Sequence, residues 1–256
     1  MHDALIGYTG FVGGNLLAQR DFDDTFNSKN IEAIDGREYD TIICAGAPAE
    51  KWKANKEPES DLATINRLIE NLARAKARKL ILISTVDVYL SPRDVDEATP
   101  IDPAELHAYG RHRRMLEEFA INRFDTLTVR LPGLFGDGLK KNAIYDFIHD
   151  NNVEQLHSEG VFQFYGLDNL WRDIQVALNH RVDLINFATE PVSLSEIAHH
   201  VFSRDFQNLL DHEPANYDMK SRHACLYSGT NGYLYDKGQV LSQMRDFVAR
   251  CPGENR

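Results

Sequence analysis

The sequence has few cysteines and no long apolar run. Its three cysteines, Cys44, Cys225 and Cys251, are an odd number, lie far apart and form no CxxC pair. This pattern excludes a disulfide framework and a structural zinc site, and it is typical of a reducing compartment. No apolar run approaches the roughly 20 residues that a membrane-spanning helix needs. The N-terminus also lacks the basic region of a signal peptide, so we expect a cytoplasmic protein that does not enter a membrane.

Positive charge is scarce as well. The 256 residues include 28 lysines and arginines against 39 aspartates and glutamates, which gives a formal net charge of −11. Nucleic-acid binding needs clustered cations, so this balance argues against nucleic acid as a partner. Hydrophobic residues make up 43% of the chain, as in folded globular proteins and unlike disordered ones. The ten histidines show no metal-ligand spacing, and we expect no metal site.

The first half of the chain alternates short β-rich runs with longer helical patterns. We predict strands at 4–6, 25–27, 41–44, 80–83 and 127–131, and helices through 16–18, over 62–77 and over 104–123. Strands that alternate with helices imply right-handed βαβ crossovers. The sequence therefore predicts an α/β fold with a Rossmann-like, doubly wound parallel sheet.

The alternation of strands and helices becomes less regular after Gly136. We predict helices at 143–149, 167–178 and 239–249 and a strand at 184–188. A further helix is expected to begin at Ser193, because Ser193 and Glu196 have the Ser-x-x-Glu spacing of a capping box.

A glycine-rich loop stands between the first strand and the first helix. Glycines there allow a tight turn and a close approach of the backbone to a pyrophosphate, which then meets the N-terminus of the helix. The alternative is a glycine turn without a ligand. On the first interpretation the cofactor-binding residues of the loop are Gly7, Thr9, Gly10, Phe11, Val12 and Gly13.

The end of the second predicted strand bears on the choice between NAD and NADP. An acidic residue there binds the ribose 2′-hydroxyl, whereas cations accept a 2′-phosphate. The segment Asn27-Ser28-Lys29 has a cation and no acid, which slightly favours NADP. The alternative is a turn made of residues that favour turns.

Further motifs follow the glycine loop in a fixed order. They are Ala45-Gly46-Ala47, Pro58 with Asn66, the segment Ser84–Tyr89, Tyr109-Gly110 with Glu117, and Arg130–Gly136. In this order, over residues 3–136, the chain resembles the extended short-chain dehydrogenase/reductases, the NAD-dependent epimerase/dehydratases of nucleotide sugars. The resemblance implies that Ala45, Gly46, Ala47, Asn66, Leu131 and Pro132 also contact the cofactor.

The resemblance also implies a catalytic set. It assigns Thr85 as the hydroxyl that orients a carbonyl and Tyr109 as the acid/base. Tyrosine ionises near pH 10, so a nearby cation is needed to stabilise its phenolate. A cation four residues later lies on the same face of the helix. The chain departs from the family here, because the family's lysine is Arg113 in this sequence.

The implied activity is that of an NAD(P)-dependent oxidoreductase or epimerase of a nucleotide-activated sugar. Epimerisation and reduction stay open, and Val86-Asp87 in place of an Asp-Glu pair disfavours dehydration. The alternative is a catalytically silent NAD(P)-binding regulatory or assembly protein. We expect a Rossmann domain over 1–136, to which 183–202 returns, and a reduced substrate-binding region over 137–256. By analogy with the family, helices 62–77 and 104–123 are the candidates for a homodimer interface.

Overall fold

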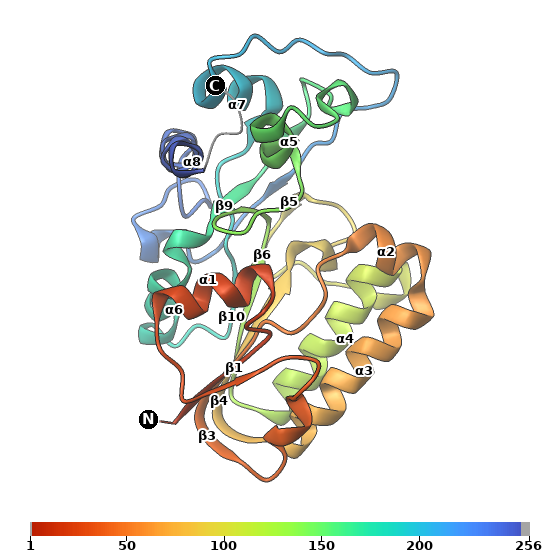
Figure 1. Cartoon of the computed structure of the whole chain (residues 1–256), viewed down its shortest axis with the longest axis vertical. Helices are drawn as coiled ribbons and strands as arrows, with labels where there is room; N and C mark the ends of the chain where they lie inside the picture. Colours follow the sequence, from red (N-terminus) through yellow and green to blue (C-terminus); the bar gives the residue numbers. More distant parts are fainter. Residues whose placement is uncertain (1, 252–256) are drawn as a thin grey trace. The chain divides into compact units, whose positions relative to one another are not determined.

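A six-stranded parallel sheet is the centre of the computed structural model, which describes residues 2–251. The strands lie in the order β10-β6-β4-β3-β1-β2 (Figure 1). Their bounds are β1 Asp3–Ile6, β2 Asp24–Phe26, β3 Glu38–Cys44, β4 Lys76–Thr85, β6 Thr126–Leu131 and β10 Leu184–Asn186. Each strand runs parallel to its neighbours. The predicted α/β fold with a doubly wound sheet is confirmed.

The order of the strands reverses beside β1. β2 pairs with one edge of β1, and β3 pairs with the other. From β3 the sheet continues through β4 and β6 to β10. In open α/β sheets, ligands bind outside the carboxyl ends of the strands at such a switch point. Ile6 ends β1 and Cys44 ends β3, so the residues that follow them are the first candidates for a ligand site.

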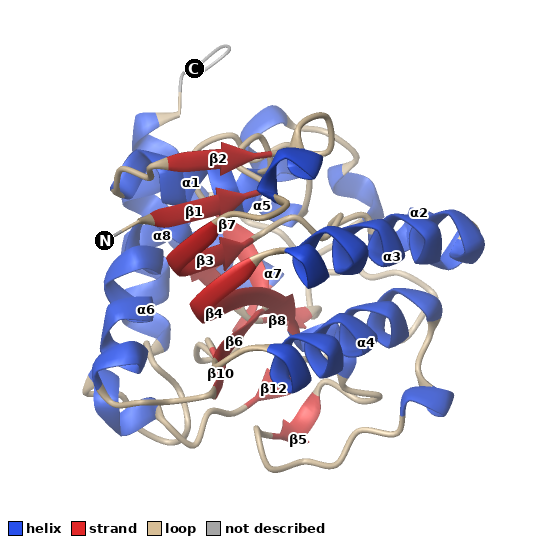
Figure 2. Cartoon of the chain, turned by 90° about the horizontal axis from the view of Figure 1, so that it is seen from below, coloured by secondary structure: helices blue, strands red, loops and turns tan. Residues whose placement is uncertain are grey.

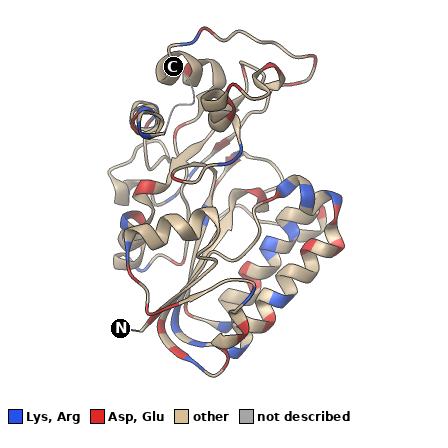
Figure 3. Cartoon of the chain, viewed as in Figure 1, with Lys and Arg blue, Asp and Glu red and all other residues tan. Residues whose placement is uncertain are grey.

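Helices cover both faces of the sheet. α3 (Pro58–Arg74) and α4 (Ala108–Arg123) lie on one face, and α1 (Phe11–Gln19) and α6 (Leu170–Asn179) lie on the other (Figure 2). The short α2 (Lys51–Lys56) precedes α3. Ile65, Leu68 and Leu72 form the buried stripe of α3, at the spacing of an amphipathic helix. Each such side chain contributes about 1.5–3 kcal/mol when fully buried. Acidic and basic residues alternate on the outer surfaces of α3 and α4 (Figure 3).

Two predicted helices differ from the structure at one end. α3 ends at Arg74 and not at 77, because Lys76 already pairs with Glu38 in the sheet. α4 begins at Ala108 and not at 104, because a short 3-10 turn (Pro103–Glu105) comes first. His107 then caps α4: its Nδ1 accepts a hydrogen bond from the Gly110 N–H at 3.1 Å.

The later elements follow the prediction with small changes at their ends. α5 (Ala143–His149) has the predicted bounds, and α8 (Lys237–Arg250) is longer than predicted. The predicted strand 184–188 ends at Asn186, and the predicted helix 167–178 is a 3-10 turn (Leu167–Asn169) followed by α6. The capping box is confirmed, because Ser193 and Glu196 exchange both hydrogen bonds at the start of α7 (Leu194–Phe202).

The chain divides into two compact units. The first comprises the chain up to Ser91, Ala98–Leu131 and Leu170–Asn186, and it contains the six-stranded sheet. The second comprises Pro92–Glu97, Pro132–Asn169 and the chain from Phe187 onward. The segment that returns to the first unit is thus 170–186, whereas the sequence predicts 183–202.

The second unit is built from α5, α7, α8 and three two-stranded sheets. These sheets pair β5 (Arg93–Val95) with β12 (Asp218–Met219), β7 (Gly133–Phe135) with β9 (Phe164–Gly166), and β8 (Val161–Phe162) with β11 (Val192–Ser193). The buried amide of Gln163 joins them: its Nε2 donates to the carbonyl oxygen of Met219 at 2.8 Å, and its Oε1 accepts from the Met219 N–H at 2.8 Å. No helix among residues 2–251 is long and apolar enough to cross a membrane.

Candidate active site

The glycine loop joins β1 to α1 at the switch point of the sheet. Gly7 has a φ of +89°, and a Cβ there would lie 2.3 Å from the carbonyl oxygen of Ala45. A Cβ on Gly13 would lie 2.1 Å from the carbonyl oxygen of Gly7. Both distances are far below van der Waals contact. The close approach of β1, β3 and α1 therefore requires glycine at these two positions.

The N-terminus of α1 offers backbone N–H groups to an anion. Gly10 is the N-cap residue of this helix, and it has no side chain with which to cap it. Thr9 and Gly10 are exposed, whereas Phe11 and Val12 are half-buried. The first N–H groups of a helix lack intrahelical partners, and the helix dipole favours negative charge there. The loop therefore fits a pyrophosphate group.

The residues after β3 lie next to the glycine loop. The Ala45 N–H donates to the carbonyl oxygen of Ile6 at 2.9 Å. A Cβ on Gly46 would approach Cγ2 of Ile6 to 3.0 Å, so a larger residue there would press on the end of β1. The structure thus brings Ala45–Ala47 and the loop together at one edge of the sheet.

The segment after β2 forms a turn held by Asn27. Its Oδ1 accepts the Lys29 N–H at 2.8 Å, and its Nδ2 donates to the hydroxyl of Tyr8 at 3.1 Å. The carbonyl oxygen of Ser28 accepts a hydrogen bond from Arg67 at 3.1 Å. Arg67 is thus a second cation near this turn, and it belongs to α3, far away in the sequence. The NADP preference stays a prediction.

The three further predicted cofactor residues are Asn66 on α3, Leu131 at the end of β6 and Pro132 directly after it. Asn66 is exposed on α3, next to the buried Ile65. Leu131 is the buried last residue of β6, and Pro132 is the first residue of the segment Pro132–Asn169 of the second unit.

The side chain of Thr85 lies close to the phenol of Tyr109 and lowers its pKa. Thr85 is the last residue of β4, and its Oγ1 also accepts the Asp87 N–H at 3.1 Å. Tyr109 lies in the first turn of α4, where its N–H donates to Oδ1 of Asn55 at 3.0 Å. A Cβ on Gly110 would lie 2.2 Å from the carbonyl oxygen of Asp87. The glycine therefore lets α4 approach the residues that follow β4, and this approach brings Tyr109 to the end of β4, where Thr85 lies.

The surroundings of Tyr109 keep its phenol protonated. Burial raises the pKa of Tyr109, while the positive charge of Arg113 and the hydrogen bond with Thr85 lower it. The negative charges of Asp87 and Asp61 add to the increase, and the net effect is a pKa above the ordinary value of 10.0. Tyr109 is 7% exposed, so the cause that acts most strongly is the loss of water around the phenolate.

Arg113 lies over the ring of Tyr109. Its guanidinium carbon is 4.0 Å from the ring centroid, and the residue is 2% exposed. The guanidinium does not face the tyrosine alone. Its Nη2 donates to Oδ1 of Asp61 at 2.9 Å and to the carbonyl oxygen of Pro48 at 2.5 Å, and its Nη1 donates to Oδ2 of Asp61. The predicted catalytic cation is thus one half of a buried, two-pronged ion pair.

Asp61 is a residue that the sequence-based prediction missed. It lies in the first turn of α3, where acids are common, so its position along the sequence suggests only a favourable interaction with the helix dipole. In the structure it is 8% exposed, and its Oδ2 also lies 2.7 Å from Nδ1 of His112. Burial raises the pKa of Asp61, but the hydrogen bonds from Arg113 and His112 outweigh burial and lower the pKa below its ordinary value of 3.8.

A buried polar network supports β4 and α4 from behind. The Glu117 carboxylate accepts hydrogen bonds from Ser84 at 2.6 Å and from Arg130 at 2.9 and 2.7 Å. Arg130 also donates to the Tyr89 hydroxyl at 2.8 Å, and that hydroxyl is hydrogen-bonded to Asn186. Glu117 is fully buried and Arg130 is 1% exposed. The network therefore fixes the strand that carries Thr85 against the helix that carries Tyr109.

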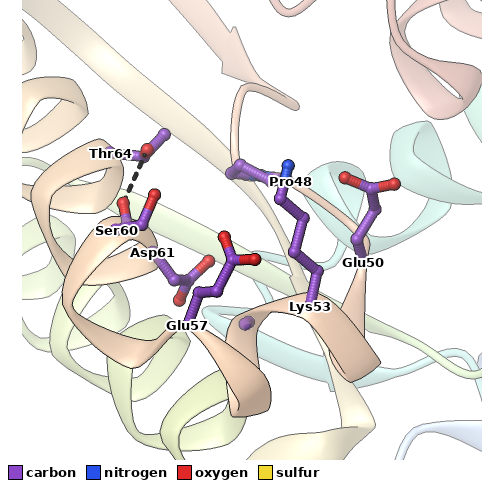
Figure 4. Close-up of a pocket in the computed structure, with 8 residues that line it drawn as sticks. Pro48, Glu50, Lys53, Glu57, Ser60, Asp61 and Thr64 are labelled. Carbon is purple, nitrogen blue, oxygen red and sulfur yellow. Dashed lines mark hydrogen bonds between the residues drawn. The ribbon is translucent and has the colours of Figure 1, made fainter.

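A small cavity of about 120 Å³ lies between α2 and the start of α3 (Figure 4). Its lining residues are Pro48, Glu50, Lys53, Ala54, Glu57, Ser60, Asp61 and Thr64. Asp61 lines this cavity and also holds Arg113, so the cavity reaches the ion pair next to Tyr109.

The described part of the chain holds no group of three or more histidine, cysteine, aspartate or glutamate side chains that could bind a metal ion. Cys44 is buried at the end of β3, and burial raises the pKa of its thiol to about 11. A thiol with this pKa stays protonated near neutral pH, which agrees with its interpretation as a small core residue.

Residues 18–177 match the NAD dependent epimerase/dehydratase family. The chain belongs to this family. The match covers the strands and helices that carry Thr85, Tyr109 and Arg113, and the resemblance seen in the sequence is confirmed. No curated protein sequence matches the chain significantly.

Solved structures share the fold over nearly the whole chain. UDP-glucose 4-epimerase from Thermotoga maritima, bound to UDP-glucose, has a TM-score of 0.71 and 14% identity, over 97% of this chain and 98% of that one. MoeE5 in complex with UDP-glucose and NAD has a TM-score of 0.72 and 14% identity, over 97% and 98%. RMD from Pseudomonas aeruginosa, complexed with NADPH, has a TM-score of 0.71 and 15% identity, over 97% and 98%.

The family implies a dinucleotide cofactor, and the residues of the first unit fit one. The glycine loop has room for a pyrophosphate, because Gly7 and Gly13 bring the backbone close and α1 begins without a capping side chain. Ala45–Ala47 follow the neighbouring strand at the same edge of the sheet. These groups belong to the chain's own backbone, so the fit does not depend on one side chain.

Proposed function

We propose that the protein is an NAD(P)-dependent oxidoreductase or epimerase that acts on a nucleotide-activated sugar. The observation that carries this proposal is the buried Tyr109, which lies beneath the cation of Arg113 and next to Thr85, in a chain of this family. In our proposal the first unit binds the cofactor, and the region from residue 137 onward binds the sugar nucleotide.

The chemistry assigned to the residues is transfer of a proton at one sugar oxygen. Thr85 donates a hydrogen bond to that oxygen and orients it. Tyr109 gives its proton to the oxygen of a ketone, or as phenolate takes the proton of a hydroxyl. Arg113 stabilises the phenolate through its charge at the ring. NAD(P) supplies or accepts the hydride at the sugar carbon when it is bound.

The experiment that tests the proposal measures oxidation of NADPH and NADH across a panel of sugar nucleotides and their keto forms. We expect turnover with at least one of them. Epimerisation is followed separately by chromatography of the sugar nucleotides, since it leaves no net change in the cofactor. A chain that binds neither nucleotide cofactor contradicts the proposal.

A second function is favoured by one specific observation, the pairing of Arg113 with Asp61. An arginine held in this way gives less support to a phenolate than a free lysine does. A catalytically silent NAD(P)-binding regulatory or assembly protein would keep the glycine loop and lose the proton transfer. Cofactor binding without turnover of any sugar nucleotide, together with an unchanged result for Arg113→Lys, favours this alternative.

The partner surface proposed for a homodimer consists of α3 and α4. Ile121 on α4 is 51% exposed and would lie in this interface. The sedimentation coefficient of the parent protein and of Ile121→Asp tests this proposal, since only the variant should sediment as a monomer.

A further inference from the structure

Asp61 lies on α3 and Tyr109 on α4, and Arg113 connects the two side chains. Its carboxylate receives both Nη groups of Arg113, and the guanidinium lies over the Tyr109 ring. The second side chain on this carboxylate is His112, one residue before Arg113 on α4. The backbone carbonyl of Pro48 completes the set. Three groups, the Asp61 carboxylate, its partner His112 and the Pro48 carbonyl, thus fix the cation beside the phenol.

We propose that Asp61 is a positioning residue that holds Arg113 as a neutral pair over Tyr109 and so sets the pH range in which Tyr109 gives up its proton. The inference rests on the proposed function, because it concerns the same tyrosine. It assigns a role to a side chain that contacts Tyr109 only through Arg113.

The physical reason is the partial cancellation of two charges. A cation near a phenol stabilises the phenolate, and an anion near the same phenol destabilises it. Asp61 and Arg113 are both almost fully buried, so solvent screens neither charge. Other charged or titratable groups around this end of α4 are Asp87 after β4, Lys51 on α2, and His107 and His112 on α4. Glu50, Lys53 and Glu57 line the cavity beside Asp61. Lys51 and Asp87 lie 2.7 Å apart and form a pair of their own.

The consequence for the chemistry is a preferred direction. Burial, together with the partial cancellation of the Arg113 charge by Asp61, keeps Tyr109 a phenol and not a phenolate near neutral pH. A phenol can donate its proton to a carbonyl oxygen while the carbonyl carbon receives a hydride from a reduced nicotinamide, and the products are an alcohol and the phenolate. Asp61 therefore favours reduction of a keto sugar nucleotide over oxidation of its alcohol.

The test reads the ionisation of residue 109 directly and does not need turnover. Tyr109 is replaced by difluorotyrosine, whose phenol ionises in an accessible pH range, and fluorine NMR follows its titration in the full-length protein. We expect Asp61→Asn to move the midpoint toward lower pH by about one pH unit. The matched control is Glu59→Gln, which removes an exposed acid from the same turn of α3 and should leave the midpoint unchanged. A midpoint for Asp61→Asn equal to that of the control overturns the proposal.

A second comparison covers the case in which Asp61→Asn alone does not fold. Arg113→Gln leaves Asp61 without its cation, whereas the double variant Asp61→Asn/Arg113→Gln is neutral. We expect residue 109 to ionise at higher pH in the single variant than in the double one, and equal midpoints contradict the role of Asp61. If these midpoints shift as expected but no sugar nucleotide is turned over, Asp61 sets the ionisation of Tyr109 and the proposed function alone fails.

Discussion

The hydroxyl of Tyr109 is the atom that the proposed chemistry needs most. Tyr109→Phe removes this hydroxyl and leaves the ring beneath Arg113, so the fold should be retained. General acid–base catalysis contributes about 10²–10⁴-fold, and we expect kcat to fall by that factor. Cofactor binding, followed by NADPH fluorescence, should not change. Tyr39→Phe is the control, since that buried tyrosine bonds Asp24 at the other end of β3. Unchanged turnover in Tyr109→Phe would show that the assigned mechanism is wrong.

Arg113 fits its place better than a lysine would. A lysine has one ammonium group and cannot form the two-pronged bond with Asp61 while also reaching the carbonyl oxygen of Pro48. We expect Arg113→Lys to lower the free energy of unfolding by about 1.5–3 kcal/mol, the cost of a lost hydrogen bond to a charged group. Urea denaturation measures this loss, and a reduced kcat should accompany it. Higher activity in the lysine variant would instead identify a site that has decayed from the family's pattern.

At the scale of the element, the position of α4 depends on one glycine. A Cβ on Gly110 would meet the carbonyl oxygen of Asp87, so Gly110→Ala must move the helix away from the residues that follow β4. Overpacking of this kind costs about 1–3 kcal/mol, which exceeds the gain of about 1 kcal/mol from helix propensity. We expect lower stability and a larger loss of kcat, because Tyr109 moves away from Thr85.

The matched control for this variant is Gly14→Ala in α1. A Cβ at Gly14 would lie 3.7 Å from the nearest heavy atom, an ordinary contact, so helix propensity alone should act and the melting temperature should not fall. Equal changes in melting temperature for the two variants would contradict the close packing of α4.

The elements themselves differ in how far the sequence predicts them. The strands in the middle of the sheet are continuous apolar runs. Such runs can be recognised in the sequence without knowledge of the strands that pair with them. The end of α3 cannot be predicted in this way, because residues 75–77 could continue the helix. In the structure Lys76 instead pairs with Glu38 of β3 in the sheet. The start of α4 depends on a histidine cap, which is outside the usual capping residues.

At the scale of the whole molecule, carboxylates that accept hydrogen bonds from cations make the stability depend on pH. Hydrogen bonds from Arg113 and His112 outweigh the effect of burial and hold the pKa of Asp61 below 3.8, so its contribution to stability is complete above that pH. The contribution is lost as the pH falls through the lower pKa of the folded state. For Glu196, burial raises the pKa, but hydrogen bonds from Lys237 and Ser193 lower it below 4.5, so it acts in the same direction.

We therefore expect the free energy of unfolding to decrease as the pH falls below about 4.5, in urea titrations at a series of pH values. In Asp61→Asn the free energy of unfolding should decrease less steeply with falling pH, since the asparagine side chain does not titrate. An unchanged slope in that variant would assign the acid sensitivity to other carboxylates.

The sequence by itself determined the α/β class, the succession of strands and helices along the chain, and the glycine loop. It also identified Thr85, Tyr109 and Arg113 as candidate site residues. Each of these depends on local spacing: apolar runs, glycines at a strand end, and an i, i+4 pair on a helix. The tertiary structure alone decided what Arg113 does. Its partner Asp61 is 52 residues away on another helix, and no local pattern predicts that pair. Burial by both helices then made the pair strong, because water no longer screens its charges.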